Sequence, residues 1–191
     1  TVTITNVNEA PSISSSSTYT ADENQLAIGT LQASDADGDS LIYSITGSEL
    51  SISSSGVLSF NSAPDYETKT SYLATVSVSD GILSASQNII ISINNLDDND
   101  PVFTSNLTFS VNENQTSIGT VTASDPDGGA ITYSMSNSSD ISIDSSSGVL
   151  TFITAPDYEV KTYYEAIVLA TDQSSSQQSA QIKVSINNLN D

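Results

Sequence analysis

Acidic side chains recur at fixed places in both halves of this chain, and they are the residues with the most informative chemistry. The 191 residues include 23 Asp and Glu against 3 Lys and Arg, for a formal net charge of -20. Two carboxylates about 4 Å apart repel by about 1 kcal/mol in water and by about 4 kcal/mol at an effective dielectric constant of about 20. Three lysines cannot neutralise such groups, so the pattern predicts a bound cation.

The available ligands indicate which cation this is. The chain has no His and no Cys, which zinc and the softer transition metals prefer. Ca²⁺ accepts roughly six to eight oxygen ligands from carboxylates, amides and backbone carbonyls, whereas Mg²⁺ keeps several waters and ranks second. Calcium is therefore the expected cofactor.

The acids belong to a sequence repeat. The segment ADENQLAIGTLQASDADGD at 21–39 returns as VNENQTSIGTVTASDPDGG at 111–129, and SSGVLSFNSAPDYETKTSY at 54–72 returns as SSGVLTFITAPDYEVKTYY at 146–164. Such self-similarity predicts duplicated structural units. The expected division is a first repeat at 11–95, a linker at 96–100, a second repeat at 101–188, the last strand and linker of a preceding repeat at 1–10, and the start of a further linker at 189–191.

Each repeat has the pattern of short β-strands. Apolar residues alternate with Ser or Thr between Tyr72 and Val78 and between Ile89 and Ile93, a period of two. The fold class predicted is all-β, as two tandem seven-stranded Greek-key β-sandwiches of immunoglobulin-like size, placed end to end. In the first repeat the strands are expected at 12–20, 27–34, 41–45, 50–53, 56–60, 72–79 and 87–94.

Aromatic positions retained in both repeats mark the expected core. They are Tyr19 with Phe109, Tyr43 with Tyr133, Phe60 with Phe152, Tyr66 with Tyr158, and Tyr72 with Tyr164. Tyr163 replaces Ser71 and alternates with Tyr164, so it is expected to face solvent.

Strand parity and turn positions distribute the acids between the two ends of each sandwich. The DxD turns and the acids closing the 72–80 and 164–172 strands should lie where the chain enters, and the ENQ and DYE segments where it leaves. Stacking the repeats would then gather acids of both around the LDDND linker. These acids are Glu23, Asp65, Glu67, Asp125, Asp127 and Asp172.

The linker NLDDNDP at 95–101 resembles the D-x-N-D-N-x-P linker of cadherin repeats, with Asn95 and Asp97 exchanging the expected acid and amide. Other family motifs follow in order: Glu23 resembles the Glu near the start of a cadherin repeat, 65–67 its DRE triplet, 125–127 its DxD, and Asp172 the Asp closing its penultimate strand. The chain therefore resembles tandem cadherin repeats, of the kind found in large bacterial adhesins or surface proteins.

What the resemblance implies is a row of about three Ca²⁺ ions at the junction. The implied ligands nearer the first repeat are Glu23, Asp65, Glu67 and Asp98. Those nearer the second are Asp97, Asp125, Asp127 and Asp172, with the backbone carbonyls of Leu96 and Asn99. Half sites at the chain ends comprise Asn8, Asp35, Asp37 and Asp80, and Glu113, Asp157, Glu159 and Asp191.

The implied function is a calcium-rigidified spacer in an extracellular adhesin, cell-surface or secreted and of bacterial type, since the composition is rich in Ser and Thr, poor in Lys and free of Cys. Expected partners are adjacent repeats of a longer array, with a protein or glycan ligand and a weak homophilic contact as further candidates. The alternative is a Ca²⁺-dependent carbohydrate- or protein-binding module, for which Tyr163 is the only aromatic hint.

Other classes are disfavoured. The charge repels nucleic acid and anionic lipid, and no apolar run of about 18 residues predicts membrane insertion. DADGDS at 35–40 begins like an EF-hand loop but has Ser40 at the Gly position and Thr46 at the Glu position. Asp65 and Glu67 are spaced for a glycosidase pair, yet no aromatic-lined cleft is evident and His is absent, so no catalytic residue is assigned and no enzyme is expected.

Overall fold

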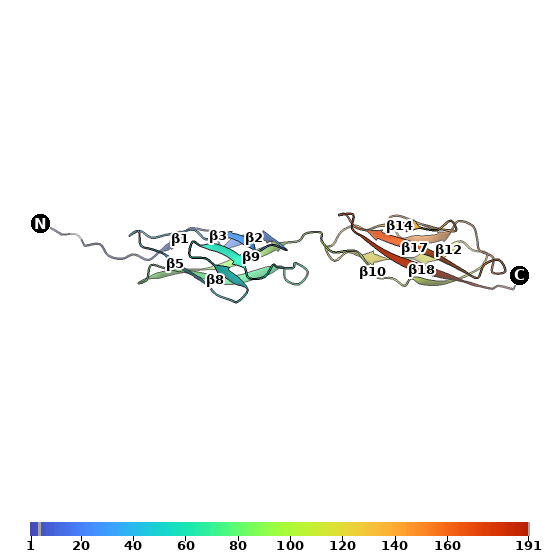
Figure 1. The fold of residues 1–191 in the computed structure, drawn as a ribbon, viewed down its shortest axis with the longest axis horizontal. Helices are drawn as coiled ribbons and strands as arrows, with labels where there is room; N and C mark the ends of the chain where they lie inside the picture. Colours follow the sequence, from blue (N-terminus) through green and yellow to red (C-terminus); the bar gives the residue numbers. More distant parts are fainter. Residues whose placement is uncertain (4, 191) are drawn as a thin grey trace. The chain divides into compact units, whose positions relative to one another are not determined.

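The computed structural model describes residues 1–3 and 5–190 and divides into two compact units, Thr1–Leu96 and Asp97–Asp191. Each unit is built from β-strands (Figure 1), and no helix in the described part of the chain has the length and apolar character needed to cross a membrane. Residues 1–3 and 5–10 form no strand, so the last strand expected there stays a prediction.

Unit 1 contains three hydrogen-bonded sheets, in the orders β2-β9-β8-β5, β3-β7-β6 and β1-β4. β2 runs parallel to β9, and the other pairs are antiparallel. The strands are β1 (Ser12–Ile13), β2 (Thr18–Asp22), β3 (Ala27–Thr30), β4 (Ala33–Ser34), β5 (Ile42–Ile45), β6 (Leu50–Ile52), β7 (Val57–Phe60), β8 (Ser71–Ser79) and β9 (Ser84–Asn94).

Unit 2 repeats this topology with the orders β11-β18-β17-β14, β12-β16-β15 and β10-β13. Its strands are β10 (Val102–Phe103), β11 (Thr108–Asn112), β12 (Ser117–Thr120), β13 (Ala123–Ser124), β14 (Thr132–Ser136), β15 (Ile141–Ile143), β16 (Val149–Phe152), β17 (Tyr163–Thr171) and β18 (Gln177–Asn187). The predicted duplication of an all-β unit is confirmed.

Two of the strands expected in unit 1 are each interrupted. The segment 12–20 divides because β1 pairs with β4, whereas β2 pairs with β9 in a different sheet, and the serines at 14–17 between them offer neither sheet an apolar side chain. The segment 27–34 divides at Leu31, whose N–H leaves the ladder to donate to Gly56 O at 2.8 Å. Nine strand segments thus replace the seven that the pattern predicted.

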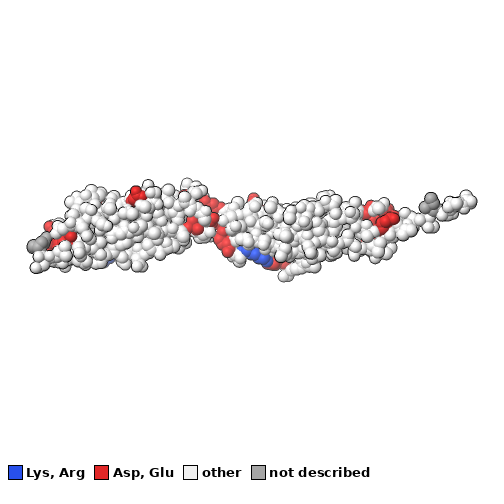
Figure 2. Space-filling view, turned by 180° about the vertical axis from the view of Figure 1, so that it is seen from behind, with Lys and Arg blue, Asp and Glu red and all other residues white. Residues whose placement is uncertain are grey.

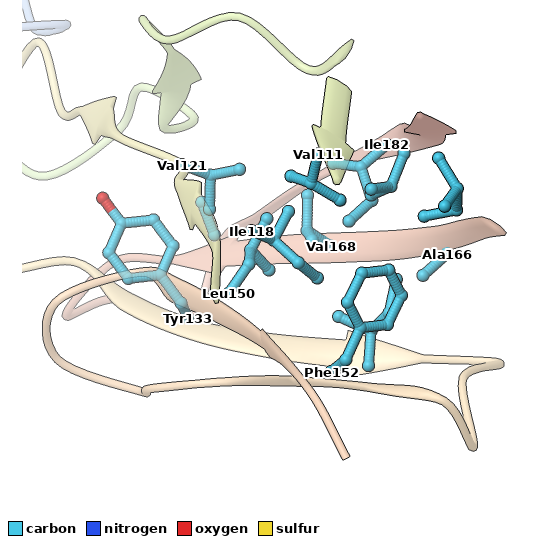
Figure 3. Packing of buried hydrophobic residues seen from close by; sticks show 13 residues of the cluster. Val111, Ile118, Val121, Tyr133, Leu150, Phe152, Ala166, Val168 and Ile182 are labelled. Atoms are coloured by element: carbon cyan, nitrogen blue, oxygen red, sulfur yellow. The ribbon is translucent and has the colours of Figure 1, made fainter. Parts of the chain in front are cut away.

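The core of each unit lies between its two larger sheets. Alternation places Val76 and Val78 of β8 and Ile89 of β9 at zero exposure, facing Leu58 of β7. Figure 3 shows the equivalent packing in unit 2, where Val168, Ile182 and Leu150 converge. Each such side chain contributes about 1.5–3 kcal/mol through its removal from water. Each core contains residues of its own unit only.

The aromatic predictions hold. Phe60 is buried and meets the Tyr72 ring edge-on, with the ring centroids 5.0 Å apart, and Phe152 meets Tyr164 in the same way at 4.9 Å. Tyr163 is 49% exposed, as its parity on β17 requires. The remaining paired aromatics are buried or pack half-buried against the two cores.

Gly56 occupies a turn that admits no side chain. Its φ is +82°, and a Cβ on it would lie 2.5 Å from the carbonyl oxygen of Leu31, the residue whose N–H donates to Gly56 O. Gly38 has a similar φ of +78°, but a Cβ there would have no neighbour within 4 Å. Substitution of Gly38 therefore tests the cost of the left-handed backbone alone, whereas substitution of Gly56 adds the cost of steric overlap.

We predict that Gly56→Ala destabilises unit 1 by more than about 2 kcal/mol, because a left-handed conformation costs about 1–2 kcal/mol and overpacking adds about 1–3 kcal/mol. Gly38→Ala, the matched control, should cost only the first part. Urea unfolding of both variants measures the difference in unfolding free energy. Equal costs would contradict the importance of the Leu31 contact.

Candidate metal centre

The acidic residues gather in patches on a surface that is otherwise largely uncharged (Figure 2). Those that form clusters of three or more lie on turns and at strand ends.

The most buried cluster lies at the N-terminal end of unit 2 and comprises Asp97, Asp125 and Asp172, named here the Asp172 cluster. One carboxylate oxygen of each lies within 4.8 Å of the others. Asp172 is only 6% exposed. Its Oδ1 accepts hydrogen bonds from Ser174 Oγ at 2.9 Å and from Ser176 N at 2.8 Å. The buried Oδ2 atoms of Asp125 and Asp172 have no hydrogen-bond donor.

Local structure explains why these side chains meet. Asp172 directly follows β17, and Asp125 directly follows β13. Asp125 Oδ1 accepts the N–H of Asp127 at 2.9 Å, which closes the turn and fixes the orientation of the carboxylate. Gly129 leaves room for this carboxylate, since a Cβ there would lie 2.9 Å from Asp125 Oδ2.

The electrostatics of the Asp172 cluster are unfavourable in the absence of a cation. Desolvation raises the pKa of Asp97, and repulsion from the charges of Asp172 and Asp125 raises it further. A raised carboxylate pKa means that the surroundings disfavour the anion. A divalent ion would reverse this imbalance.

Asp127 organises the linker on the unit 2 side. Its Oδ2 accepts the backbone N–H groups of Asp98 at 3.0 Å and Asn99 at 2.7 Å, and its Oδ1 accepts Asn99 Nδ2 at 3.1 Å. Asp100 accepts a hydrogen bond from Ser176 Oγ. The linker backbone of residues 98 and 99 is thus held to the DxD turn.

The C-terminal end of unit 2 carries a second cluster, formed by Glu113, Asp157 and Glu159, with one oxygen of each within 4.8 Å. Glu113 is 2% exposed and accepts Tyr158 N at 2.9 Å and Leu189 N at 2.7 Å. These three predicted ligands are therefore brought together. Asp191, the fourth, lies outside the described residues.

The same end of unit 1 is built alike around Glu23, which is 2% exposed. Glu23 accepts Tyr66 N at 2.7 Å and Leu96 N at 2.8 Å. Asp65 instead accepts the N–H and hydroxyl of Thr68 at 3.1 and 3.0 Å, so its carboxylate faces its own turn. Among residues 1–3 and 5–190, Asp65 joins no group of three clustered carboxylates.

At the N-terminal end of unit 1, oxygens of Asp35, Asp37 and Asp39 lie within 4.8 Å of one another. Asp35 Oδ2 is buried without a donor, whereas Asp37 accepts Glu9 N at 2.9 Å and Asn6 Nδ2. The sequence analysis missed Asp39, although its spacing of two residues from Asp37 was a signal.

Asp80, also at this end, accepts hydrogen bonds on both of its carboxylate oxygens. Its Oδ1 accepts Ile82 N and Leu83 N, both at 2.6 Å, and its Oδ2 accepts Asn8 Nδ2 at 2.9 Å. These bonds lower the pKa of Asp80. The predicted ligands Asn8 and Asp80 are therefore in contact.

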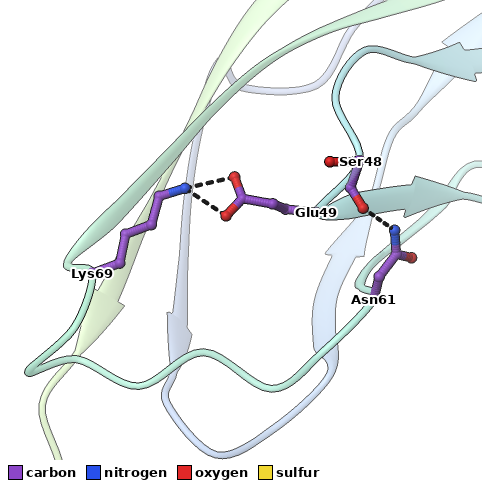
Figure 4. Close-up of polar contacts among 4 residues, drawn as sticks. All are labelled: Ser48, Glu49, Asn61 and Lys69. Carbon is purple, nitrogen blue, oxygen red and sulfur yellow. Dashed lines mark hydrogen bonds and ion pairs between the residues drawn. The ribbon is translucent and has the colours of Figure 1, made fainter.

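The three lysines contact acids and tyrosine rings outside these clusters. Lys69 pairs with Glu49 at 2.5–2.7 Å (Figure 4), and its ammonium lies 4.1 Å from the centroid of the Tyr72 ring. Lys161 repeats this with Asp140 and Tyr164, and Lys183 lies 4.8 Å from the centroid of the Tyr163 ring. Within the residues that the structure describes, no lysine forms an ion pair with an acid of these clusters.

The donor sets fit calcium. All the acidic ligands are oxygen donors, and Asp35, Asp125 and Asp172 each present a buried carboxylate oxygen without a donor. A hard cation with flexible oxygen coordination would satisfy such atoms.

Comparison with known proteins identifies the repeats. Residues 107–187 match the family model of the cadherin domain, and residues 8–92 match the model described as a bacterial Ig domain. The chain is 36% identical over 157 residues to cadherin-23 of Rattus norvegicus, covering 75% of this chain and 5% of that protein. It is 37% identical over 133 residues to chitinase A of Pseudoalteromonas piscicida, covering 68% of this chain and 16% of that protein.

Solved structures agree on the fold. Mouse cadherin-23 EC22-24 superposes with a TM-score of 0.81 at 23% identity, covering 97% of this chain and 68% of that chain. Human protocadherin-24 EC1-2 gives 0.81 at 22%, covering 96% of this chain and all of that one. Residues 107–187 are thus a cadherin domain, and the chain is a tandem pair of cadherin-like repeats, modules that are extracellular and occur in arrays.

We predict opposite effects for two acid-to-amide changes in metal-free protein at neutral pH. Asp97→Asn should raise the melting temperature of unit 2, because the repulsion that raises the Asp97 pKa disappears. Asp144→Asn should lower it, because four donors from Ser146 and Ser147 stabilise the anion and lower its pKa.

The direction of each pKa shift determines how the stability of unit 2 depends on pH. The unfavourable contribution of Asp97 is absent below the unfolded carboxylate pKa of about 3.9 and grows as pH rises through the folded value. The favourable contribution of Asp144 is present above about 3.9 and is lost as pH falls through its lower folded value. Melting curves in EDTA between about pH 3 and 7 test both, and shifts of equal sign in the two variants would show the assignment to be wrong.

Proposed function

We propose that this pair of cadherin-like repeats is a calcium-rigidified spacer within a cell-surface or secreted adhesin. The observation that carries the proposal is the Asp172 cluster, in which two buried carboxylate oxygens lack any donor while the pKa of the third acid is raised. These atoms need a cation that the chain does not supply.

The proposed ligands follow the cadherin resemblance. About three Ca²⁺ ions are assigned to the linker and its flanking acids. Their ligands are Glu23, Asp65, Glu67, Leu96, Asp97, Asp98, Asn99, Asp125, Asp127 and Asp172. Asp65 must reorient to bind, because its carboxylate accepts the hydroxyl of Thr68.

Bound calcium would supply positive charge that holds several carboxylates together. Asp97 and Asp98 lie on the linker itself, directly after Leu96, whose N–H donates to Glu23. Ions bound to the linker carboxylates would restrict rotation of this backbone. Because each hydrophobic core contains residues of one unit only, both units are expected to stay folded without calcium.

The setting of the whole protein is also a proposal. The chain spans 5% of the length of cadherin-23 and 16% of chitinase A, so the partners and activities of a complete protein lie beyond it. The bacterial Ig match and the Pseudoalteromonas relative support a bacterial origin. We assign the repeats no catalytic role of their own, because their acids are arranged as clusters with metal-like spacing.

One observation favours the alternative of a carbohydrate- or protein-binding module. The exposed Tyr163 lines a surface groove together with Tyr158, Glu159, Lys161 and Glu165. The Lys183 ammonium lies over the Tyr163 ring, however, and competes with stacking of a sugar on it. Co-sedimentation with insoluble polysaccharide, lost in Tyr163→Ala, would favour the module over the spacer.

We predict that calcium increases the radius of gyration of the 191-residue chain and narrows its distance distribution in small-angle scattering, relative to EDTA. The transition should occur at about 10⁻⁵ to 10⁻³ M Ca²⁺, the range of extracellular sites and weak sensors. At a hundredfold excess over the dissociation constant, each bound ion should also stabilise the fold by about 2.7 kcal/mol.

Asp98→Ala should abolish most of this stiffening. The matched control is Glu165→Ala, which removes an exposed carboxylate outside every cluster and should respond like the parent. Identical scattering curves with calcium and with EDTA in the parent chain would overturn the spacer function.

A further inference from the structure

We infer that the two units bind calcium unequally at their N-terminal ends, with a tight ion at the Asp172 cluster of unit 2 and a weak one at the corresponding place in unit 1, where amide groups replace the cation. This inference rests on the proposed function. It adds a prediction of which end of the chain releases its calcium first as the calcium concentration falls.

The unit 2 end has the features of a site that needs a cation. Asp172 is 94% removed from solvent, and its Oδ1 is already satisfied by Ser174 and Ser176. Its Oδ2 and that of Asp125 are buried without a donor. One oxygen of each lies within 4.8 Å of the others and of Asp97, close enough for a single ion to contact all three residues. Burial of an anionic oxygen without a partner is costly, so an ion has a large effect here.

The repeat offset identifies the unit 1 counterparts. A shift of 90 places Val7 at Asp97, Asn8 at Asp98 and Asp35 at Asp125, and a shift of 92 places Asp80 at Asp172. Val7 is 71% exposed and has no side-chain ligand atom. The unit 1 end has therefore lost two of the linker carboxylates that unit 2 retains.

Asp35 Oδ2 is buried without a donor, as its counterpart Asp125 Oδ2 is, so the two ends differ at Asp80, the counterpart of Asp172. Both oxygens of Asp80 have donors, namely Ile82 N, Leu83 N and Asn8 Nδ2. Where Asp172 Oδ2 has no partner, Asp80 Oδ2 accepts an amide at 2.9 Å. A calcium ion at Asp80 must therefore displace or reorient Asn8, which reduces the net gain from binding.

Asp39 does not remove this difference. It adds a carboxylate near Asp35 and Asp37 where unit 2 has Gly129, yet it is exposed. An ion held by this turn would keep much of its water and bind weakly. As calcium falls, the N-terminal end of unit 1 should therefore empty while the Asp172 cluster remains loaded.

The test is calorimetric titration of Ca²⁺ into the 191-residue chain and two matched isosteric variants. Asp172→Asn should weaken the tightest class of ions by about tenfold or more, because ligand charge sets calcium affinity. Asp80→Asn should leave that class within about twofold of the parent. Melting curves in EDTA confirm folding, and Asp172→Asn should fold at least as stably as the parent because it removes an uncompensated buried charge.

A gain-of-function variant makes the test independent of any loss of folding. Val7→Asp combined with Asn8→Asp restores the linker acids of unit 2 and should add one ion to the tight class. An Asp80→Asn variant as impaired as Asp172→Asn, or a double variant with unchanged stoichiometry, would overturn the inference while leaving the spacer function intact. A parent chain that binds no Ca²⁺ at millimolar concentration would instead refute the proposed function.

Discussion

Carboxylate oxygens that are shielded from water but lack a donor are the constraint on which this structure depends. Asp125 and Asp172 each hold such an atom at the N-terminal end of unit 2. The lysines cannot relieve it, because Lys69, Lys161 and Lys183 are paired with tyrosine rings and, for the first two, with other acids. These two oxygens therefore remain available to the cation that the proposed function requires.

This constraint does not compromise folding, because the acids and the cores are separated. The two hydrophobic clusters lie between the sheets, whereas the clustered carboxylates lie on turns and at strand ends. Where acids are buried, as at Glu23 and Glu113, paired backbone N–H groups satisfy them. A buried carboxylate that accepts hydrogen bonds from the backbone is held in place by them. A buried carboxylate oxygen without a hydrogen-bond donor needs another partner, such as a cation. Both arrangements occur within one unit.

Sequence reasoning succeeded where a periodic pattern acts locally. Alternation identified the buried faces of β8 and β9 and the outward orientation of Tyr163, because neighbouring side chains on a strand must face opposite sides. It failed at 14–17, since strand switching depends on which sheet supplies a partner for the backbone. Residue spacing also could not predict the hydrogen bond from the Thr68 hydroxyl to Asp65. Whether this carboxylate accepts a hydroxyl of its own turn or binds a metal depends on the rotamer of Asp65. The proposed set of calcium ligands came from the resemblance to cadherin repeats, because the spacing of the acids along the chain alone does not assign them to individual ions.

The differences between the repeats show which parts of the unit are free to change. The core positions at Phe60 and Phe152 are identical, since the space between the sheets admits few alternatives. On the outer face of the larger sheet, the cross-strand pair Leu73 and Ile90 in unit 1 is replaced by Glu165 and Lys183 in unit 2. Solvent accepts either pair at little cost in stability. The linker positions at the unit ends also differ, because Val7 and Asn8 stand where unit 2 has Asp97 and Asp98. Under the calcium-binding function proposed above, such changes in the linker would alter calcium affinity from one repeat to the next while the core of each repeat stays the same.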